Sequence, residues 1–422
     1  MAFGDCADDQ ALRGAWQKFC RALADAGDLA FKDSIPASTA HRVDAFRLLT
    51  QNLGQAFDLA LETKNTKYPV IHAFCSPFCK LGGDNADFTY QQAWVDGESV
   101  YKISGNRGTS RFFNIAVHGA KPPVKGGYRP MADPFGDIPE ANMFGHEMAI
   151  NWDGSFEVQI GGERPDPALC PNWLPTNSGT RKLFIRNGFD NWSETPARIR
   201  IERVGMAEPR PMPTPAEMIT AMEWAGDFVA GLKSDWPDWA YEFADDLDPT
   251  DINHFPTGRR QLAGGVRNVV NNEATDRRRG RSIYTMFWKL QPDEALIIEW
   301  DATDIFWMMT NMNSNIHSMD YLYRPVSYSP ARTKVDSDGK YRMVLAHKDP
   351  GFHNWMDTQE LDQGSICNRN MLTDHVTLFS TRLVKHADLD SAMPADSARV
   401  TPEQRAEKLR QRFHSILHRY VI

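Results

Sequence analysis

The sequence lacks long apolar runs: no run reaches the ~18 residues that a membrane-spanning helix needs. Its first residues, MAFGDCADDQ, contain no basic segment followed by an apolar stretch, so a secretory signal is not expected. Positive charge is not in excess either: 47 Lys and Arg stand against 55 Asp and Glu, which gives a net charge of −8 and no broad footprint for nucleic acid. We therefore predict a cytoplasmic protein that binds neither membranes nor nucleic acid.

The motifs that commonly hold nucleotides or metals are absent as well. The chain has no Gly-rich phosphate loop, no dinucleotide fingerprint and no Gly-x-Ser-x-Gly elbow. His146-Glu147 begins like a zinc-protease helix, but Ile150 stands where the second His is needed. Cys75 and Cys79 form one short-spaced pair, whereas a structural zinc site usually needs two such pairs. We expect no cofactor and assign no metal ligand.

What the chain does contain is a length and composition typical of a β-rich protein with several domains. Its 422 residues include 12 Trp, 26 Pro and 29 Gly, which favours strands joined by many turns. Apolar residues recur at helical spacing over the first sixty residues and begin to alternate after residue 69. The predicted units are an N-terminal helical segment (1–64), a first β-sandwich (65–206), a helical linker (207–250), a second β-sandwich (251–390) and a linker with a C-terminal helix (391–422).

Helix starts are marked by capping residues. Thr214 with Glu217, and Thr401 with Gln404, each form a capping box with proline at the first helical position. Ser38 or Thr39 can cap a helix over the second apolar repeat of the N-terminal segment.

The two β-rich stretches resemble one another. Both contain a glycine, a strand, an Asp-Pro pair, an Asn-Trp-x-x-Thr motif and an arginine, in the same order over about fifty residues. The Asn-Trp pairs are Asn172-Trp173 and Asn354-Trp355. We predict a mainly β fold with flanking helices, in which an internal duplication produced two tandem jelly-roll-like β-sandwiches. A cleft at their junction is the expected ligand site.

Several segments carry a family resemblance. They are residues 264–265, 290–299, 320–324, 346–350 and 354–358, and, nearer the N-terminus, residues 84–87, 94–97 and 105–108. These segments are similar to a bacterial family built around a C-terminal domain of unknown function, the "twelve-fourteen" domain, in a long form with a related N-terminal sandwich. The resemblance covers most of the chain and implies jelly-roll-like sandwiches but no established reaction. Members usually carry a His shortly after the Asn-Trp-Leu-Asp-Thr motif, whereas this chain has Leu361 there.

The richest set of reactive side chains follows residue 347. Asp357 is a candidate general base or acid, His353 can orient it or share its proton, and Arg369 can bind a developing negative charge. The alternative is that these polar residues only fix turns. The first copy has Cys170 and Pro175 where the second has His353 and Asp357, so these two gain functional weight. Asn354, Trp355 and Arg369 have counterparts in both copies, which favours a structural role.

A second candidate cluster follows the apolar strand over residues 305–309. His317 and Asp320 can form an acid–base couple, and Tyr323 can position a substrate. Trp307 and the methionines beside it suggest an apolar pocket wall, with plain core packing as the alternative. In the first sandwich, Arg107 is the substrate-binding candidate.

The leading hypothesis is a cofactor-independent acid–base enzyme, a lyase, isomerase or hydrolase, acting on a small and largely apolar molecule in the cleft between the sandwiches. The alternative is a carbohydrate- or small-ligand-binding protein without catalysis. A shallow row of exposed tryptophans would favour sugar binding, and a closed pocket with His and carboxylate would favour an enzyme. Trp94, Trp300 and Trp307 are the tryptophans expected to reach a pocket. A homo-oligomer, with the terminal helix packed on a neighbouring subunit, remains a third option.

Overall fold

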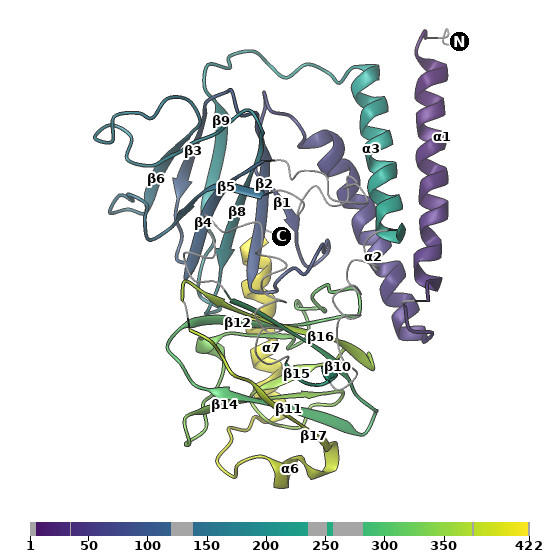
Figure 1. The fold of residues 1–422 in the computed structure, drawn as a ribbon, viewed down its shortest axis with the longest axis vertical. Helices are drawn as coiled ribbons and strands as arrows, with labels where there is room; N and C mark the ends of the chain where they lie inside the picture. The colour runs from purple at the N-terminus through teal and green to yellow at the C-terminus, as the bar shows by residue number, and fades with distance from the viewer. Residues whose placement is uncertain are drawn as a thin grey trace.

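The computed structural model describes residues 6–33, 35–119, 138–234, 251–255, 282–373 and 375–420. Gly264-Gly265 of the family resemblance and the basic run at residues 277–281 lie outside these ranges. The described chain is mainly β with flanking helices, as predicted, and its strands form two pairs of sheets (Figure 1).

The first sandwich pairs a five-stranded sheet, of order β1-β2-β8-β4-β5, with a four-stranded sheet, of order β7-β6-β3-β9. Its strands are β1 (His72–Cys75), β2 (Phe88–Trp94), β3 (Tyr101–Asn106), β4 (Phe112–Gly119), β5 (Ile138–Phe144), β6 (Ser155–Ile160), β7 (Trp173–Leu174), β8 (Thr180–Gly188) and β9 (Arg198–Arg203). Apolar side chains such as Ile103, Val117 and Val158 fill the space between the two sheets.

The second sandwich pairs two four-stranded sheets, of order β10-β16-β12-β13 and β15-β14-β11-β17. Its strands are β10 (Ser282–Lys289), β11 (Glu294–Asp301), β12 (Phe306–Met312), β13 (Ser327–Tyr328), β14 (Lys340–Ala346), β15 (Trp355–Asp357), β16 (Gln363–Met371) and β17 (Ser380–Lys385). Its core contains Trp288, Trp300 and Trp307, all fully buried or nearly so.

The two sandwiches have the same strand connectivity. With β1 set aside, β2 to β9 correspond in order to β10 to β17, including the short parallel pairs β6–β7 and β14–β15. This equivalence agrees with the repeated sequence motifs. A common origin of the two halves stays a prediction.

Three helices cover the outer face of the five-stranded sheet. They are α1 (Asp9–Ala26), α2 (Thr39–Phe57) and α3 (Pro215–Ser234), with the short helices η1 (Gly27–Phe31) and η2 (Asp58–Glu62) following α1 and α2. Phe19, Leu48 and Phe228 from these helices share one apolar cluster with Phe74 and Phe184 of the sheet. The helices therefore stand beside the first sandwich, and the predicted linker helix α3 returns to pack against α1 (Figure 1).

The predicted helix caps are present. The amide of His41 donates to the Ser38 hydroxyl at the start of α2. Thr214 and Glu217 exchange hydrogen bonds before α3, and Thr401 and Gln404 do so at the start of α7 (Pro402–Tyr420). The remaining short helices are η6 (Pro330–Arg332), η7 (His386–Asp388) and α6 (Leu389–Ala392).

Helix α7 joins the two sandwiches within one chain (Figure 1). Ile416 packs into the core of the second sandwich, while the Tyr420 hydroxyl donates to the Phe88 carbonyl of the first. Arg405, Arg412 and Arg419, spaced by seven residues, are buried on the same side of the helix. This basic stripe forms part of the junction between the sandwiches.

Candidate functional site

Three of the candidates from the sequence line cavities, in two separate places that each lie at a junction between elements. His353 lines a cavity of about 210 Å³ beside α7, which we call the α7 cavity. His317 and Asp320 line a cavity of about 20 Å³ beside α2, which we call the α2 pocket. The smaller volume is only enough for about one water molecule.

The α7 cavity is formed by the loop after β8, by the second sandwich and by α7. Trp192 comes from the first sandwich, and Tyr328 and His353 come from the second. Five cationic side chains complete the walls: Arg332, Lys334, Arg405, Lys408 and Arg412. None of the described residues lining this cavity is an Asp or a Glu.

A hydrogen bond to Asn354 fixes the tautomer of the His353 ring. Its Nδ1 lies 3.0 Å from Oδ1 of Asn354, an oxygen that also accepts from the Lys334 amide. Because Oδ1 can only accept, Nδ1 carries the proton and the Nε2 lone pair is left available. Burial lowers the pKa of His353 to about 4, and the positive charge of Lys408 acts in the same direction. The imidazole is therefore neutral at pH 7 and can accept a proton at Nε2.

Two of the five cations are paired with carboxylates. Arg332 lies 2.6 Å from Asp87, and Arg405 binds Asp349 through two nitrogens, at 2.8 and 3.2 Å. Asp87 is also 3.7 Å from Arg419. These arginine charges keep the pKa of Asp87 below its ordinary value although burial opposes them.

The other three cations, Lys334, Lys408 and Arg412, form no ion pair with a carboxylate among the described residues. Arg412 donates to the hydroxyl and the carbonyl of Ser327, at 3.1 and 2.8 Å, which are uncharged acceptors. Burial lowers the pKa of Lys408, and the charges of Arg405 and Lys334 add to the effect.

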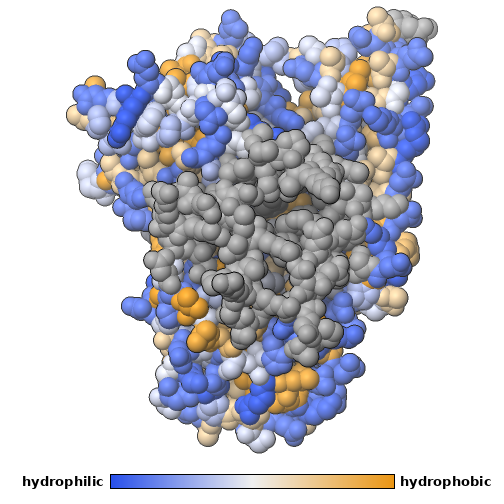
Figure 2. Space-filling model, viewed as in Figure 1, coloured by the Kyte–Doolittle hydropathy of each residue, from blue (hydrophilic) through white to orange (hydrophobic). Residues whose placement is uncertain are grey.

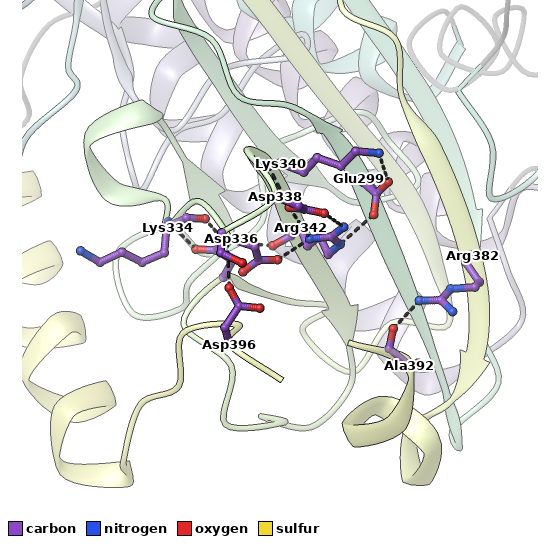
Figure 3. A network of polar contacts seen from close by, with 11 residues as sticks. Glu299, Lys334, Asp336, Asp338, Lys340, Arg342, Arg382, Ala392 and Asp396 are labelled. Carbon is purple, nitrogen blue, oxygen red and sulfur yellow. Dashed lines mark hydrogen bonds and ion pairs between the residues drawn. The ribbon is translucent and has the colours of Figure 1, made fainter. Parts of the chain in front are cut away.

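The Lys334 side chain extends away from the nearby acidic turn (Figure 3). In that turn, the Asp336 and Asp338 carboxylates bind Arg342, at 2.7 and 2.6 Å, and Arg342 also binds Glu299. Residues 336–339 form a turn, in which the Gly339 amide donates to the Asp336 carbonyl at 3.0 Å, and both carboxylates of this turn bind Arg342.

The α2 pocket is a buried polar junction. Lys80 donates from Nζ to the carbonyls of Ser318 and Met319 and lies 4.8 Å from the ring centre of Tyr321. Asp84 accepts from the Ser318 amide at 2.9 Å and from its hydroxyl. Asn313 donates to Asp44 of α2. These contacts attach α2 and the segment before β2 to the second sandwich.

The pKa values of this pocket are strongly displaced. Burial lowers the pKa of Lys80 to about 8, although Asp84 and Asp320 oppose the shift. Burial and the charge of Lys80 lower the pKa of His317 to about 3, and burial raises the pKa of Asp44. Asp320 lies 3.4 Å from Arg47 of α2.

Backbone strain also concentrates at the α2 pocket. Ile316, Gln359 and Glu360 have positive φ angles of 54°, 55° and 65°. This region is unfavourable for a β-branched residue such as Ile316. The amide of Asp320 donates to the Gln359 side chain at 2.8 Å, which fixes this corner.

Asp357 and His353 do not form the predicted pair. Asp357 lies at the end of β15, where it binds Arg324 at 3.0 Å and accepts from the Gln359 amide at 2.8 Å. His353 precedes the strand and binds Asn354 instead. Residues four apart on an extended chain are roughly 13 Å apart, which separates the two side chains.

Arg369, Trp307 and Tyr323 line neither cavity. Arg369 is half-buried between the sandwiches, where it donates to the Tyr90 hydroxyl at 3.3 Å and to the Gly83 carbonyl. Trp307 is 1% exposed and packs against Trp300 and Tyr341 in the core. The ring of Tyr323 is exposed and lies against Phe413.

Arg107 has a local role in the first sandwich. It binds the Ser110 hydroxyl and carbonyl, at 3.0 and 2.9 Å, and lies over the Phe113 ring. The three tryptophans expected to reach a pocket, Trp94, Trp300 and Trp307, are all buried in the structure. Each of these candidates therefore supports packing or a turn.

The sequence reasoning missed most of the residues that form the two cavities. Lys80 and Asp44 stand in no recognisable motif. The stripe of Arg405, Arg412 and Arg419 did carry a signal, because a spacing of seven places them near one face of the predicted helix.

Neither a cluster of metal ligands nor a membrane-spanning helix occurs in the described ranges. No group of three or more His, Cys, Asp or Glu side chains there is arranged to hold a metal ion. No helix there is both long and apolar enough to cross a membrane.

Comparison with known proteins identifies relatives of unknown function. Residues 85–187 match the family model "Protein of unknown function (DUF1214)". These residues belong to the first sandwich, whereas the sequence motifs placed the family domain in the second. The comparison with curated proteins finds no match.

Two solved structures resemble the chain over most of its length. An uncharacterized protein from Burkholderia cenocepacia is 26% identical, with a TM-score of 0.74, over 88% of this chain and 97% of its own. The VPA0106 protein from Vibrio parahaemolyticus is 12% identical, with a TM-score of 0.42, over 86% of this chain and 100% of its own. Through residues 85–187, the chain is similar to the DUF1214 family, whose function is unknown.

Proposed function

We propose that the α7 cavity is the active site of an acid–base enzyme that acts on a small molecule without an organic cofactor, and that His353 is its proton acceptor. One observation carries the proposal: a neutral imidazole with a fixed tautomer lines a cavity of about 210 Å³ at the junction of the two sandwiches. An engineered protein cavity of about 150 Å³ accommodates benzene, so this volume suits a molecule somewhat larger than benzene.

The geometry favours His353 over the other acid–base candidates. Its Nε2 makes no hydrogen bond to any described residue. Asp357 is engaged by Arg324 and a backbone amide, and the α2 pocket of His317 and Asp320 has room for little more than water. Proton transfer needs a group within reach of a bound molecule, and among these four His353 meets that requirement.

Carbohydrate binding without catalysis is the alternative. Sugar-binding sandwiches commonly present exposed aromatic rings, but the exposed tryptophans of the described chain are Trp16 in α1 and Trp152 before β6. Outside the grey area, the surface in Figure 2 is mostly hydrophilic with scattered apolar residues. Trp192 in the cavity wall lies under Arg332 and Arg412, at 4.3 and 4.8 Å, which leaves little ring face for stacking.

The equivalence of strands β2 to β9 with strands β10 to β17 supports the proposed duplication. Counted from the Asn-Trp pair, the first sandwich has Pro171 in place of His353, and counted from the Asp-Pro pair it has Cys170. A site present in only one half fits a scaffold that was doubled and then specialised.

The test is an activity screen with matched variants. The protein is incubated with a mixture of small metabolites, and NMR spectra report which compound is converted. His353→Asn keeps a donor near the Nδ1 position for Asn354 but removes the Nε2 lone pair. We expect conversion by the native protein and a loss of at least 100-fold in His353→Asn, as for removal of a general base. Full conversion by a folded His353→Asn protein would refute the assignment.

A further inference from the structure

The electrostatics of the α7 cavity define the chemical class of its ligand. The cavity walls carry five cationic side chains and no carboxylate among the described residues. Two carboxylates that do not line the cavity, Asp87 and Asp349, form ion pairs with Arg332 and Arg405, respectively. Arg412, Lys334 and Lys408 therefore leave an excess of positive charge around the cavity.

Such an excess is costly unless it is compensated. Arg412 is 4% exposed and donates hydrogen bonds to uncharged oxygens of Ser327 and Tyr321, while Asp87, which already binds Arg332, acts on it only at longer range. The Nη1 atom of Arg332 is buried and makes no hydrogen bond to any described residue. Buried charges are usually paired, and guanidinium groups bind carboxylate or phosphate oxygens in a planar fork.

From this arrangement we infer that the α7 cavity binds a small organic anion whose carboxylate or phosphate group is held by Lys408, Arg412 and Arg332. The inference deepens the proposed function and rests on it for the identity of the site. It also revises the expected ligand, since a largely apolar molecule would leave these charges unpaired. The remaining walls, including Pro325, Tyr328 and Leu409, suit a short apolar body attached to the anionic group.

The arrangement also accounts for the state of His353. Burial disfavours the imidazolium form, and the positive charges of Lys408 and Lys334 act in the same direction. A bound anion would partly cancel their charge, so the imidazole accepts a proton more readily when a ligand is present. Binding and proton acceptance are thereby coupled in one cavity.

Binding of three probes to the full chain tests the inference. The probes are benzoate, the neutral and nearly isosteric benzamide, and inorganic phosphate, each measured by calorimetry at low ionic strength. We expect benzoate or phosphate to bind and benzamide to bind at least tenfold more weakly. Benzoate binding alone identifies a carboxylate site, and phosphate binding alone identifies a phosphate site. Equal binding of benzoate and benzamide, or no binding of either anion, would overturn the inference.

Two variants of α7 locate the binding. Lys408→Gln removes a cation of the cavity wall, and we expect at least a tenfold loss of affinity, as for a lost hydrogen bond to a charged group. Arg410→Gln removes a positive charge two residues away, where the side chain is exposed and bound to Glu407, and should change affinity less than twofold. An equal effect of both variants would show that the anion binds elsewhere.

The two proposals can fail separately. Anion binding that depends on Lys408, with no compound converted in the activity screen, would remove the enzyme and keep the anion site. Conversion of a neutral compound that depends on His353, with no anion binding, would keep the enzyme and remove the anion site.

Discussion

Asn172 and Asn354 hold equivalent positions in the two sandwiches and make the same hydrogen bonds. Each side chain accepts from a backbone amide, of Ala149 or Lys334, and donates to the carbonyl of that same residue. Each also donates to a carbonyl of the neighbouring strand, at Glu157 or Arg342, at 2.9 Å in both copies. The tryptophan that follows binds the carbonyl of Gly161 or Ala346. The repeated Asn-Trp motif therefore anchors the short parallel strand of each sandwich.

This anchor predicts a large loss of stability in Asn354→Ala. The change leaves the amide and carbonyl of Lys334 and the carbonyl of Arg342 without this partner, and we expect a loss of about 2 to 4 kcal/mol in the free energy of unfolding. Urea denaturation measures it. Asn151→Ala, at an exposed asparagine that bonds Ser155, is the control and should cost less than about 0.5 kcal/mol. Equal effects of the two changes would contradict the anchoring role.

Lys80→Met should be among the most destabilising single changes. Lys80 is 5% exposed, its ammonium group donates to two carbonyls, and the charge of Asp84, which is 2% exposed, favours its protonated form. Removing one partner of buried charges leaves the other uncompensated, which costs about 3 kcal/mol or more. Asp84→Asn combined with Lys80→Met should cost less than the sum of the single changes, as measured in a double-mutant cycle. Strict additivity would show that Lys80 and Asp84 do not interact.

Stability should fall as the pH drops below about 6.5, because His317 has a pKa of about 3 in the folded chain and an ordinary value near 6.5 when unfolded. The unfolded chain therefore binds more protons in this range, and the free energy of unfolding rises with pH. His353, with a pKa of about 4, acts in the same direction. Denaturation between pH 5 and 7 should show a shallower slope in His317→Gln, by up to about 1.4 kcal/mol per pH unit. An unchanged slope would mean that folding leaves the pKa of His317 near its ordinary value.

Asp357→Asn should have a small effect on both stability and activity. Arg324 is about one third exposed, so its ion pair with Asp357 contributes about 1 kcal/mol or less, and an asparagine oxygen can still accept from the Gln359 amide. Conversion in the activity screen should remain within a factor of two of the native value. A folded Asp357→Asn protein that converts nothing would return Asp357 to the role suggested by the sequence.

The sequence determines much of the secondary structure and the repeated architecture. Helix starts at residues 39, 215 and 402 follow from capping residues that act on the adjacent turn. Strands follow from alternation, and the order of motifs in the two β-rich stretches corresponds to two sandwiches with the same strand order once β1 is set aside. These features depend on neighbouring residues or on a repeated motif, so they can be predicted from the sequence without knowledge of distant contacts.

The sites were decided by the tertiary structure. Lys80 meets Ser318 across 238 residues of sequence, and Arg332 meets Asp87 across a similar separation. No periodicity encodes such pairs, because a charged side chain is buried only where a distant partner or ligand compensates it. The sequence singled out His353 because the two copies differ at this position. Its fixed tautomer and cationic surroundings depend on the tertiary structure, in which the second sandwich and α7 place Asn354 and the arginines and lysines around it.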